Sequence, residues 1–384
     1  MSRILVVAGY LGRFGETDGV VTTYRNLLPR LAERGIEADV LVYGPDDAVE
    51  TVGSVTVVTH RPRVPIKIDP SRWIDLAIYQ SKTSYELGKR QYDLVHSSSP
   101  DPLGLFALSM AKRSNSPLVT VFHTALDHYV AIRYGRLLGQ PAGKMFGNLM
   151  YRWLAWYYNQ SDLVLAPTQQ VREELETYLN PEVRILSRGV NTDDFSPHYR
   201  QRSDSRPRAC YVGRVAPEKN LQVLVDLFTS REDVDLSVTG DGPFLQEMQS
   251  KLPRAIYNGR LKGEDLSRAY ADGDFFVFPS RTDTLGNVVL EAMSSGLPVV
   301  VSDAMGPKEM VEHGKTGFVA HTDDEFAKAV DLLSSDAELR ARMGAAARES
   351  AQARSWDSIA DQLIEYYEKV LHGTYGQTRA WQYA

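Results

Sequence analysis

Residues 275–302 read Phe275-Phe-Val-Phe-Pro-Ser-Arg-Thr-Asp-Thr-Leu-Gly-Asn-Val-Val-Leu-Glu-Ala-Met-Ser-Ser-Gly-Leu-Pro-Val-Val-Val-Ser302. An apolar run, a loop, a stretch of helical length and a second apolar run follow one another in this segment. That order is typical of a βαβ unit in a parallel sheet, and it recurs through both halves of the chain. The sequence therefore predicts an α/β protein built from two Rossmann-like doubly wound domains.

We expect strands at similar intervals in each half of the chain. Those of the first half are Ile4–Ala8, Asp39–Tyr43, Leu94–His96, Leu118–His123, Leu163–Pro167 and Val183–Leu186. Those of the second half are Ala209–Gly213, Leu236–Gly240, Ile256–Asn258, Phe275–Pro279, Val299–Ser302 and Gly317–Ala320. Between the halves, residues 191–208 carry prolines and polar side chains without apolar periodicity, which indicates a linker. The expected domains are therefore residues 1–190 and 209–355.

Composition and charge agree with a globular protein of about two domains. Of 384 residues, 43% are hydrophobic and 24% are charged, and the formal net charge is -6. The negative charge argues against nucleic acid as a partner. The single cysteine, Cys210, lies in an apolar run and is expected to be buried, which suits a reducing compartment.

The first residues of the chain lead directly into an expected strand rather than into a signal peptide. No apolar stretch reaches the roughly 18 residues that cross a bilayer. We therefore expect a cytoplasmic protein.

Ligands of doubly wound sheets bind beyond the carboxyl ends of the strands, so the loops that follow strands are the candidate sites. The first such loop, Gly9–Gly19, carries four glycines, which let a phosphate or a sugar hydroxyl approach the backbone closely. Its spacing differs from the dinucleotide-binding pattern G-x-G-x-x-G, which argues against a nicotinamide cofactor. A plain glycine loop is the alternative.

The second loop, Tyr211–Asn220, places two cations between a strand and a helix. Arg214 and Lys219 stand five positions apart, and beside a helix N-terminus they concentrate positive potential that suits a diphosphate. In the alternative interpretation, Arg214 only pairs with Glu218.

The third loop leads from Pro279 into the helix of the quoted segment. We expect Asp283 to cap this helix and the free amides of Thr284, Leu285 and Gly286 to face phosphates. Glu291 lies eight positions further on, about 12 Å along a helix axis, and a carboxylate there could accept both hydroxyls of a ribose. The alternative is an ordinary cap followed by a solvated glutamate.

The motifs Gly-Arg-Val-x-Pro-Glu-Lys at 213–219 and Pro-Ser-x-Thr-Asp-Thr-Leu-Gly-x-Val-x-Leu-Glu-Ala-Met at 279–293 resemble the donor site of retaining family 4 glycosyltransferases with the GT-B fold. Similar motifs stand at 18–20, 187–195 and 314–319, so the resemblance covers nearly the whole chain. Within this family, the chain resembles the bacterial mannosyltransferases and other glycosyltransferases that act on lipids. The resemblance implies a sugar-nucleotide donor on the C-terminal domain, an acceptor on the N-terminal domain, and a last helix, within 356–384, that packs back on the first domain.

Residue by residue, the resemblance implies that Arg214 and Lys219 bind the donor diphosphate and that Glu291 binds the ribose. Asp283 stands where the family usually has a glutamate that contacts the sugar hydroxyls. The resemblance also implies that Gly19 and the amides of residues 284–286 bind the donor. The catalytic residues are then His123, beside the transferred sugar, together with Arg214, Lys219 and Asp283. On the acceptor side the candidates are His96, Asp127 and His128.

No cofactor or metal is expected. Asp233-Val-Asp235 and Asp272-Gly-Asp274 have the Asp-x-Asp form of a metal–diphosphate site, but each precedes an expected strand and so lies at the wrong end of it. Two basic side chains and a helix N-terminus can stabilise the leaving group without a divalent ion. GDP-mannose is the first expectation for the donor, and a UDP-sugar is the second.

The segment 51–152 is locally basic, with 13 Lys and Arg against 6 Asp and Glu. Part of this charge borders the aromatic stretch Tyr151–Tyr158. Such a surface suits a lipid acceptor or the inner face of an anionic membrane, and a solvated face over a core helix is the equal alternative.

The sequence therefore predicts a retaining hexosyltransferase that acts on an acceptor hydroxyl. Two other functions stay open. A nucleotide-sugar 2-epimerase also uses paired Rossmann-like domains, and a non-catalytic subunit could bind sugar nucleotides without turnover.

Overall fold

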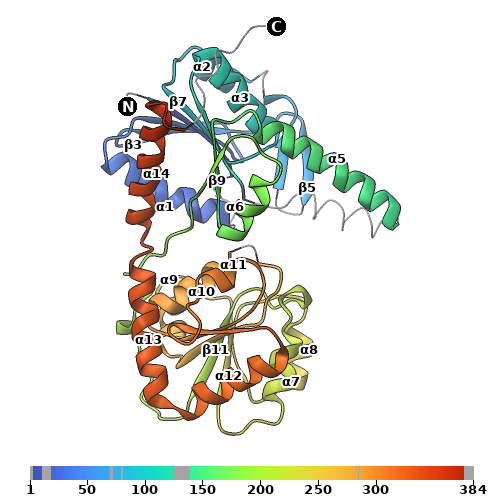
Figure 1. Cartoon of the computed structure of the whole chain (residues 1–384), viewed down its shortest axis with the longest axis vertical. Helices are drawn as coiled ribbons and strands as arrows, with labels where there is room; N and C mark the ends of the chain where they lie inside the picture. The colour runs from blue at the N-terminus through green and yellow to red at the C-terminus, as the bar shows by residue number, and fades with distance from the viewer. Residues whose placement is uncertain are drawn as a thin grey trace. The chain divides into compact units, whose positions relative to one another are not determined.

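A computed structural model of the whole chain describes residues 3–10, 19–69, 72–78, 81–123, 139–283 and 285–375 (Figure 1). The chain divides into two compact units. The first comprises Met1–Ser187 and Ile359–Ala384, and the second comprises Arg188–Ser358. Each unit has its own parallel-dominated sheet with helices, so the expected fold class of two Rossmann-like domains is confirmed.

The sheet of the first unit has the strand order β10-β9-β8-β7-β1-β2-β4-β3 in the described part of the chain, and only β3 is antiparallel to its neighbour. Its strands are β1 Ile4–Tyr10, β2 Ala38–Tyr43, β3 Ala48–Val52, β4 Val55–His60, β7 Leu94–Ser97, β8 Leu118–Val121, β9 Leu163–Ala166 and β10 Glu182–Ile185. A separate hairpin joins β5 Pro65–Asp69 to β6 Arg72–Asp75. The helices are α1 Gly19–Glu33, α2 Lys82–Gly88, α3 Pro102–Ser114, α5 Gln140–Tyr158 and α6 Gln169–Glu176. The central strands β2, β7, β8 and β9 are buried at every position, as expected of parallel strands covered on both faces.

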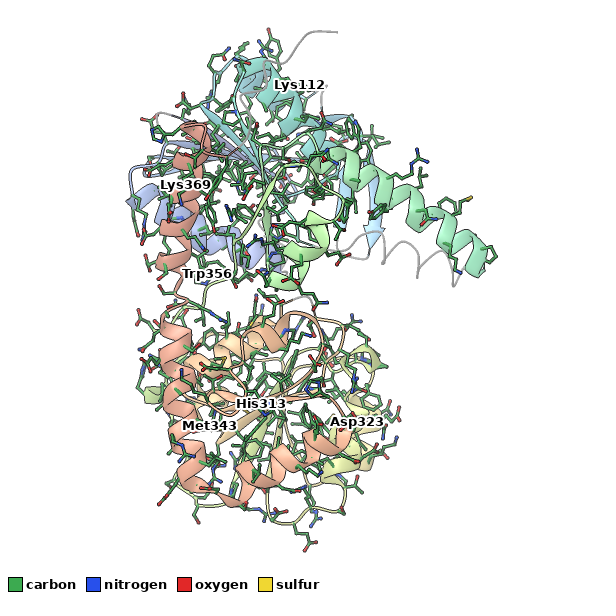
Figure 2. All side chains as sticks on the ribbon, viewed as in Figure 1. Lys112, His313, Asp323, Met343, Trp356 and Lys369 are labelled. Carbon is green, nitrogen blue, oxygen red and sulfur yellow. The ribbon has the colours of Figure 1, made fainter. Side chains whose placement is uncertain are left out.

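The last helix, α14 Trp356–Leu371, packs on the first unit through most of its length. Figure 2 labels Trp356 at its first residue and Lys369 in its last turn. Its apolar face is buried, comprising Ile359, Leu363, Tyr366, Tyr367 and Val370. The Tyr366 hydroxyl donates to the carbonyl of Ile185 at 3.0 Å, and Asp361 pairs at 2.6 Å with Arg34, the residue that follows α1. The 3.6-residue periodicity of the sequence indicated this buried face.

The sheet of the second unit has the order β13-β12-β11-β14-β15-β16 over the residues described, all parallel. Its strands are β11 Arg208–Val212, β12 Asp235–Thr239, β13 Ile256–Gly259, β14 Phe275–Phe278, β15 Val299–Ser302 and β16 Gly317–Ala320. Its helices are α7 Gln222–Phe228, α8 Leu245–Lys251, α9 Gly263–Ala271, α10 Asn287–Ser294, α11 Met305–Glu309, α12 Asp323–Ser335 and α13 Ala337–Gln352. This connectivity is the doubly wound arrangement that the βαβ pattern predicts.

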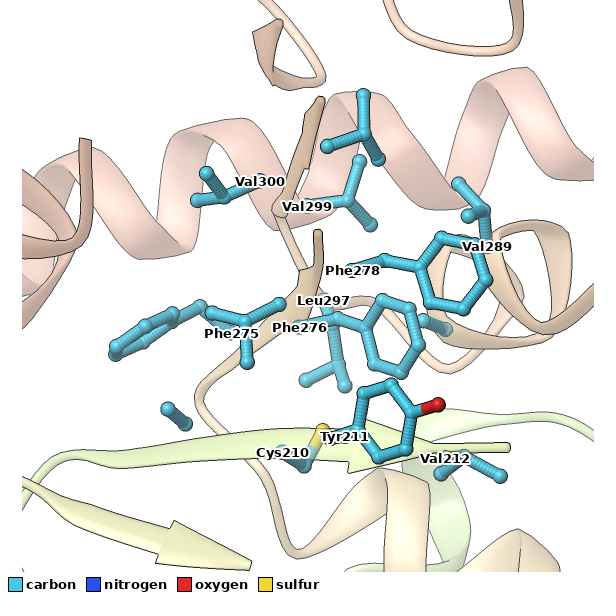
Figure 3. Packing of buried hydrophobic residues seen from close by; sticks show 14 of the residues in the cluster. Cys210, Tyr211, Val212, Phe275, Phe276, Phe278, Val289, Leu297, Val299 and Val300 are labelled. Atoms are coloured by element: carbon cyan, nitrogen blue, oxygen red, sulfur yellow. The ribbon is translucent and has the colours of Figure 1, made fainter. Parts of the chain in front are cut away.

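Aromatic side chains fill the core of the second unit beside its central strands (Figure 3). The rings of Tyr211 and Phe278 stack at 6.1 Å, and those of Phe276 and Phe278 at 6.0 Å. Cys210 of β11 is buried next to them, as expected. The core thus holds β11 and β14 firmly, and these two strands carry the loops that follow.

The strands β3 to β6 were not predicted. β3 lies at the sheet edge and is exposed along most of its length, so it lacks the apolar run of a covered strand. The β5–β6 hairpin depends on a longer-range contact. The Asp75 carboxylate pairs with the buried His60 ring at 2.7 Å and accepts the amides of Arg63 and Val64.

The segment 191–208, expected as a linker, is instead packed within the second unit. The Arg348 guanidinium donates to the carbonyls of Phe195 at 2.6 Å and Thr192 at 3.1 Å. Arg200 donates to the carbonyl of Ala271 at 3.0 Å. Hydrogen bonds of single arginine side chains therefore hold the segment against the second unit, and such contacts produce no apolar periodicity in the segment itself.

Candidate functional site

The loops that follow β11 and β12 interlock at the carboxyl edge of the second sheet. The amide of Gly213 donates to the carbonyl of Thr239, and the amide of Val215 donates to that of Asp241, both at 3.0 Å. A Cβ on Gly240 or on Gly242 would overlap a carbonyl oxygen of the facing loop, that of Gly213 or that of Val215. Both glycines are therefore required for the close approach, and this approach fixes the loop that carries Arg214. We did not predict these two glycines from the sequence, although Gly-Asp-Gly directly after a strand indicates such a close approach.

Lys219 ends a single 3₁₀ turn, Pro217–Lys219, and its ammonium group reaches the loop after β14. Its Nζ donates to both carboxylate oxygens of Asp283, at 2.7 and 2.8 Å. The two side chains are 18% and 22% exposed, so the pair is partly shielded from water. Beside it, the Thr282 hydroxyl donates to the carbonyl of Glu218 at 3.1 Å. An ammonium has three protons, so one remains for an anionic ligand.

Arg214 forms the ion pair that our alternative interpretation foresaw. Its Nη1 lies 3.2 Å from Oε1 of Glu218, and the guanidinium is 65% exposed. Exposed pairs of this kind contribute about 0 to 1 kcal/mol, so a doubly charged phosphate group can displace Glu218. The Tyr211 hydroxyl donates to the backbone carbonyl of Arg214 at 2.9 Å and holds the loop in place. Arg214 therefore remains a candidate for anion binding.

The expected cap of α10 was wrong. The helix begins at Asn287, its N-cap is Gly286 with φ 78°, and no side chain of the described residues caps it. Asp283 is paired with Lys219 instead, three residues before this cap. Because the Val289 amide donates to the carbonyl of Gly286 at 2.9 Å, the helix amides left for a ligand within the described residues are those of Asn287 and Val288. Leu285 and Gly286 precede the helix, and Thr284 lies outside the described residues.

Glu291 lies on α10, one turn into the helix. Its Oε2 accepts a hydrogen bond of 2.7 Å from the hydroxyl of Tyr270, which projects from α9. Burial raises the pKa of the Glu291 carboxyl, and the hydrogen bond from Tyr270 opposes that rise. The solvated alternative for Glu291 is therefore wrong. The sequence carried no signal for Tyr270, because the contact joins two different helices.

In the first unit, three of the expected residues lie in the described part. Gly19 is the first residue of α1, and His123 follows β8. The ring of Tyr24, on α1, lies edge-on to that of His123, with centroids 6.3 Å apart. Asp127 and His128 lie outside the described residues, as does most of the glycine loop, residues 11–18.

His96 was expected on the acceptor side, but the structure places it in the core. Its Nε2 lies 2.6 Å from the Tyr24 hydroxyl, and its Nδ1 lies 2.9 Å from that of Tyr367 on α14. Burial lowers the pKa of His96 to about 3, so the ring is neutral at physiological pH. With both nitrogens occupied by tyrosines, this residue joins α14 to α1 rather than contacting an acceptor.

Both Asp-x-Asp motifs are occupied by protein groups. Asp272 accepts the amides of Gln201 and Arg202 at 2.8 Å, and Asp274 pairs with Arg200 at 2.9 Å. Asp235 pairs with Arg206 at 2.9 Å. These carboxylates therefore lie at the start of β12 and just before β14, the end of each strand at which the sequence placed them.

The protein has two doubly wound units. In the second unit, a cationic loop, a lysine–carboxylate pair and a helix N-terminus with free amides lie at one edge of the sheet. These features define the GT-B class of glycosyltransferases. The fold agrees with a solved structure, sucrose-phosphate synthase from Thermosynechococcus elongatus, at a TM-score of 0.74 and 18% identity, over 97% of this chain and 100% of that one.

The chain belongs to glycosyltransferase family 4. Residues 17–194 match the family described as "Glycosyltransferase Family 4", and residues 196–350 match "Glycosyl transferases group 1". It is 36% identical to a "GDP-mannose-dependent alpha-mannosyltransferase" of Mycolicibacterium smegmatis, over 73% of this chain and 74% of that protein. It is 31% identical to a protein of the same description from Mycobacterium tuberculosis, over 92% and 94%. The protein is thus a nucleotide-sugar-dependent glycosyltransferase, and the family resemblance read from the motifs is confirmed.

Proposed function

We propose that this protein is a retaining mannosyltransferase that moves mannose from GDP-mannose to a hydroxyl of a lipid or glycolipid acceptor. Both relatives described above are named as GDP-mannose-dependent α-mannosyltransferases. Because the mannosyl bond of GDP-mannose is itself α, formation of an α product means retention. The observation that carries the proposal is the paired Lys219 and Asp283 in front of the start of α10.

The second unit holds the donor in this proposal. The third proton of the Lys219 ammonium and the guanidinium of Arg214 bind the diphosphate, together with the amides at the start of α10. Glu291 accepts the ribose hydroxyls, and Asp283 accepts a hydroxyl of the sugar. The first unit holds the acceptor, with His123 near the transferred sugar.

In the proposed transfer reaction, negative charge develops on the leaving phosphate. The bond from the anomeric carbon to the β-phosphate oxygen breaks, and a bond from the same carbon to the acceptor oxygen forms on the same face. The acceptor proton passes to the departing phosphate. Lys219 and Arg214 stabilise the negative charge that grows on that phosphate, which lowers the barrier. Asp283 and Glu291, the described carboxylates assigned to this site, bind hydroxyls in this proposal and leave no nucleophile among them, so we propose front-side attack through an ion-pair-like transition state.

A thermal-shift panel of GDP, UDP and their sugars tests the donor, because a bound ligand raises the melting temperature by mass action. We expect GDP and GDP-mannose to give the largest shifts, and mannose transfer to a lipid extract to yield an α-linked product. Shifts with UDP-sugars alone would overturn GDP-mannose as the donor. Isomerisation of UDP-N-acetylglucosamine without an acceptor would indicate an epimerase, and binding without turnover a non-catalytic subunit.

Metal removal provides a separate prediction. Because protein groups supply the positive charge at the leaving phosphate, we expect transfer to continue at an unchanged rate after dialysis against EDTA. The initial rate of GDP release, with and without added Mg²⁺ or Mn²⁺, measures this. Complete loss of activity with EDTA, restored by a divalent ion, would contradict a metal-free mechanism.

The first unit offers a surface for a lipid acceptor on α5. Met145, Leu149 and Trp156 are 60%, 65% and 46% exposed and recur on one face of this helix, at i, i+4 and i+11. Lys144 and Arg152 of the same helix are also exposed. Among the helices described, none has the length and apolarity needed to cross a bilayer. We therefore include a peripheral contact of α5 with an anionic bilayer in the proposal, because apolar side chains beside basic ones are suited to such a surface.

Flotation with liposomes tests the α5 contact. We expect the wild type to float with vesicles containing phosphatidylglycerol at low salt, and Met145→Ser combined with Leu149→Ser to abolish flotation. Leu332→Ser is the control, since Leu332 is also exposed on a helix, α12 of the second unit. Equal flotation of the double variant and the control would remove the membrane contact from the proposal.

A further inference from the structure

One buried hydroxyl touches the candidate donor site and has no part in the function proposed so far. The Tyr270 side chain, on α9, is fully buried, and its hydroxyl donates to Oε2 of Glu291 at 2.7 Å. Glu291 is the only group on α10 to which this tyrosine donates in the described structure. The contact joins two helices that lie on the same unit and precede different strands, β14 and β15.

The position of this hydroxyl is fixed by its surroundings. The Tyr270 ring packs edge-to-face against Phe195, with centroids 5.5 Å apart and planes at 89°. It also contacts Phe276 of β14, with centroids 5.9 Å apart. Burial raises the pKa of Tyr270 well above its usual value, so the hydroxyl keeps its proton and remains a donor at neutral pH. The aromatic packing and the protonation together give a rigid, permanent hydrogen-bond donor.

A glutamate side chain without such a partner samples many rotamers, and fixing it on ligand binding costs conformational entropy. The bond from Tyr270 fixes Glu291 before the ligand arrives. It occupies one lone pair of Oε2 and leaves Oε1 and the second lone pair of Oε2 as acceptors. Two free acceptor positions on one fixed carboxylate match the two neighbouring hydroxyls of a ribose.

We propose that Tyr270 is a positioning residue that orients the Glu291 carboxylate toward the vicinal diol of the donor ribose and so selects ribonucleotide over 2′-deoxyribonucleotide donors. This inference rests on the proposed function, in which Glu291 binds the ribose. Tyr270 touches neither the diphosphate nor the transferred sugar in this arrangement. Its removal therefore weakens nucleotide binding and leaves the chemical step unchanged.

Tyr270→Phe tests the inference, because it removes the hydroxyl and keeps the ring in its aromatic packing. We expect the Kd of GDP, measured by calorimetry, to rise about 10- to 30-fold, because the ligand must then order the Glu291 side chain itself. The Kd of 2′-deoxy-GDP changes less than threefold, so discrimination between the two nucleotides falls. In transfer assays, the donor KM rises and kcat stays within about twofold of the wild type.

Tyr257→Phe is the matched control. Tyr257 lies in the same unit, on β13, and its hydroxyl donates to the backbone carbonyls of Met248 and Leu252, both at 3.1 Å. We expect this variant to bind GDP and 2′-deoxy-GDP as the wild type does. The comparison separates loss of any buried tyrosine hydroxyl from loss of the one that contacts Glu291.

A double-mutant cycle with Glu291→Ala completes the test. On the Glu291→Ala background, Tyr270→Phe should weaken GDP binding no further. Two results would overturn the positioning role: a further loss of GDP affinity on that background as large as in the wild-type background, or a GDP Kd within twofold of the wild type for Tyr270→Phe alone.

If Tyr270→Phe does not fold, Phe195→Leu loosens the ring and keeps the hydroxyl. We then expect a smaller rise in the GDP Kd, and unchanged affinity would contradict the inference.

The failure of this inference is distinguishable from failure of the proposed function. A wild-type protein that binds no nucleoside diphosphate would refute the donor site as a whole. A wild type that binds GDP, with equal affinities for GDP and 2′-deoxy-GDP, would leave the donor site standing and refute only the ribose selection through Tyr270.

Discussion

Lys219→Ala should lower kcat by about 10² to 10³-fold, the effect expected when one donor to a developing negative charge is removed. Lys219 is held at 2.7 and 2.8 Å by the two oxygens of Asp283, so its ammonium is already in place before the donor binds. Without the lysine, the Asp283 carboxylate is left unpaired beside the diphosphate. The variant then loses the attraction between Lys219 and the diphosphate and gains a repulsion between Asp283 and the diphosphate. We therefore expect it to be among the most damaging single substitutions at this site.

Initial rates of GDP release with GDP-mannose and a lipid acceptor measure this effect. Lys251→Ala is the control, because Lys251 also pairs with a carboxylate, that of Glu247 at 2.7 Å, but on the surface of α8. We expect the control to retain wild-type kcat. A Lys219→Ala enzyme with kcat within tenfold of the wild type would show that the leaving phosphate is stabilised by other groups.

The strands that are easiest to predict from the sequence are those in which every residue is buried among apolar side chains. β14 is apolar at each position because helices cover both faces of the sheet, and the run Phe275–Phe278 is visible in any short window. The strand β3, at the sheet edge, is exposed at every position after Ala48, so it has no apolar run and its composition resembles that of a loop. Local composition therefore predicts strands with a continuous apolar run, including the edge strand β16, and misses β3 and its neighbour β4, in which apolar and polar residues are mixed.

Within the candidate site, the sequence predicted which loops carry the polar groups, because strand ends can be located. It did not predict which groups meet. From the local sequence alone, Asp283 is expected to cap a helix. In the structure its carboxylate pairs with Lys219, 64 residues earlier in the chain, and the helix begins later, at Asn287. The Tyr270–Glu291 contact has the same origin, since it depends on how α9 and α10 pack. Pairings between distant elements require the tertiary structure.

Gly240→Ala should be the second variant of large effect, through geometry rather than charge. The ideal Cβ at this position overlaps the carbonyl oxygen of Gly213, and the φ of +141° is one that L side chains rarely adopt. Because both obstacles are backbone features, no side chain can move to relieve them. We expect the second unit to lose about 2 to 4 kcal/mol of unfolding free energy from overpacking and backbone strain together.

The same change should lower transfer activity by about 100-fold even where the protein remains folded. The loop that must retreat from the new Cβ begins at Gly213 and carries Arg214, and a shift of about 1 Å at a positioning element can cost this much. Gly263→Ala is the matched control, since Gly263 also has a positive φ, +56°, but a Cβ there meets nothing within 4 Å. Thermal melts and initial rates of both variants separate the two causes: backbone strain lowers the stability of both, and less at the left-handed φ of Gly263, whereas the close approach of the loops predicts a severe loss of transfer activity in Gly240→Ala only. Equal behaviour of the two variants would show that the loop can relax, and that the contact between Gly240 and Gly213 does not set the position of Arg214.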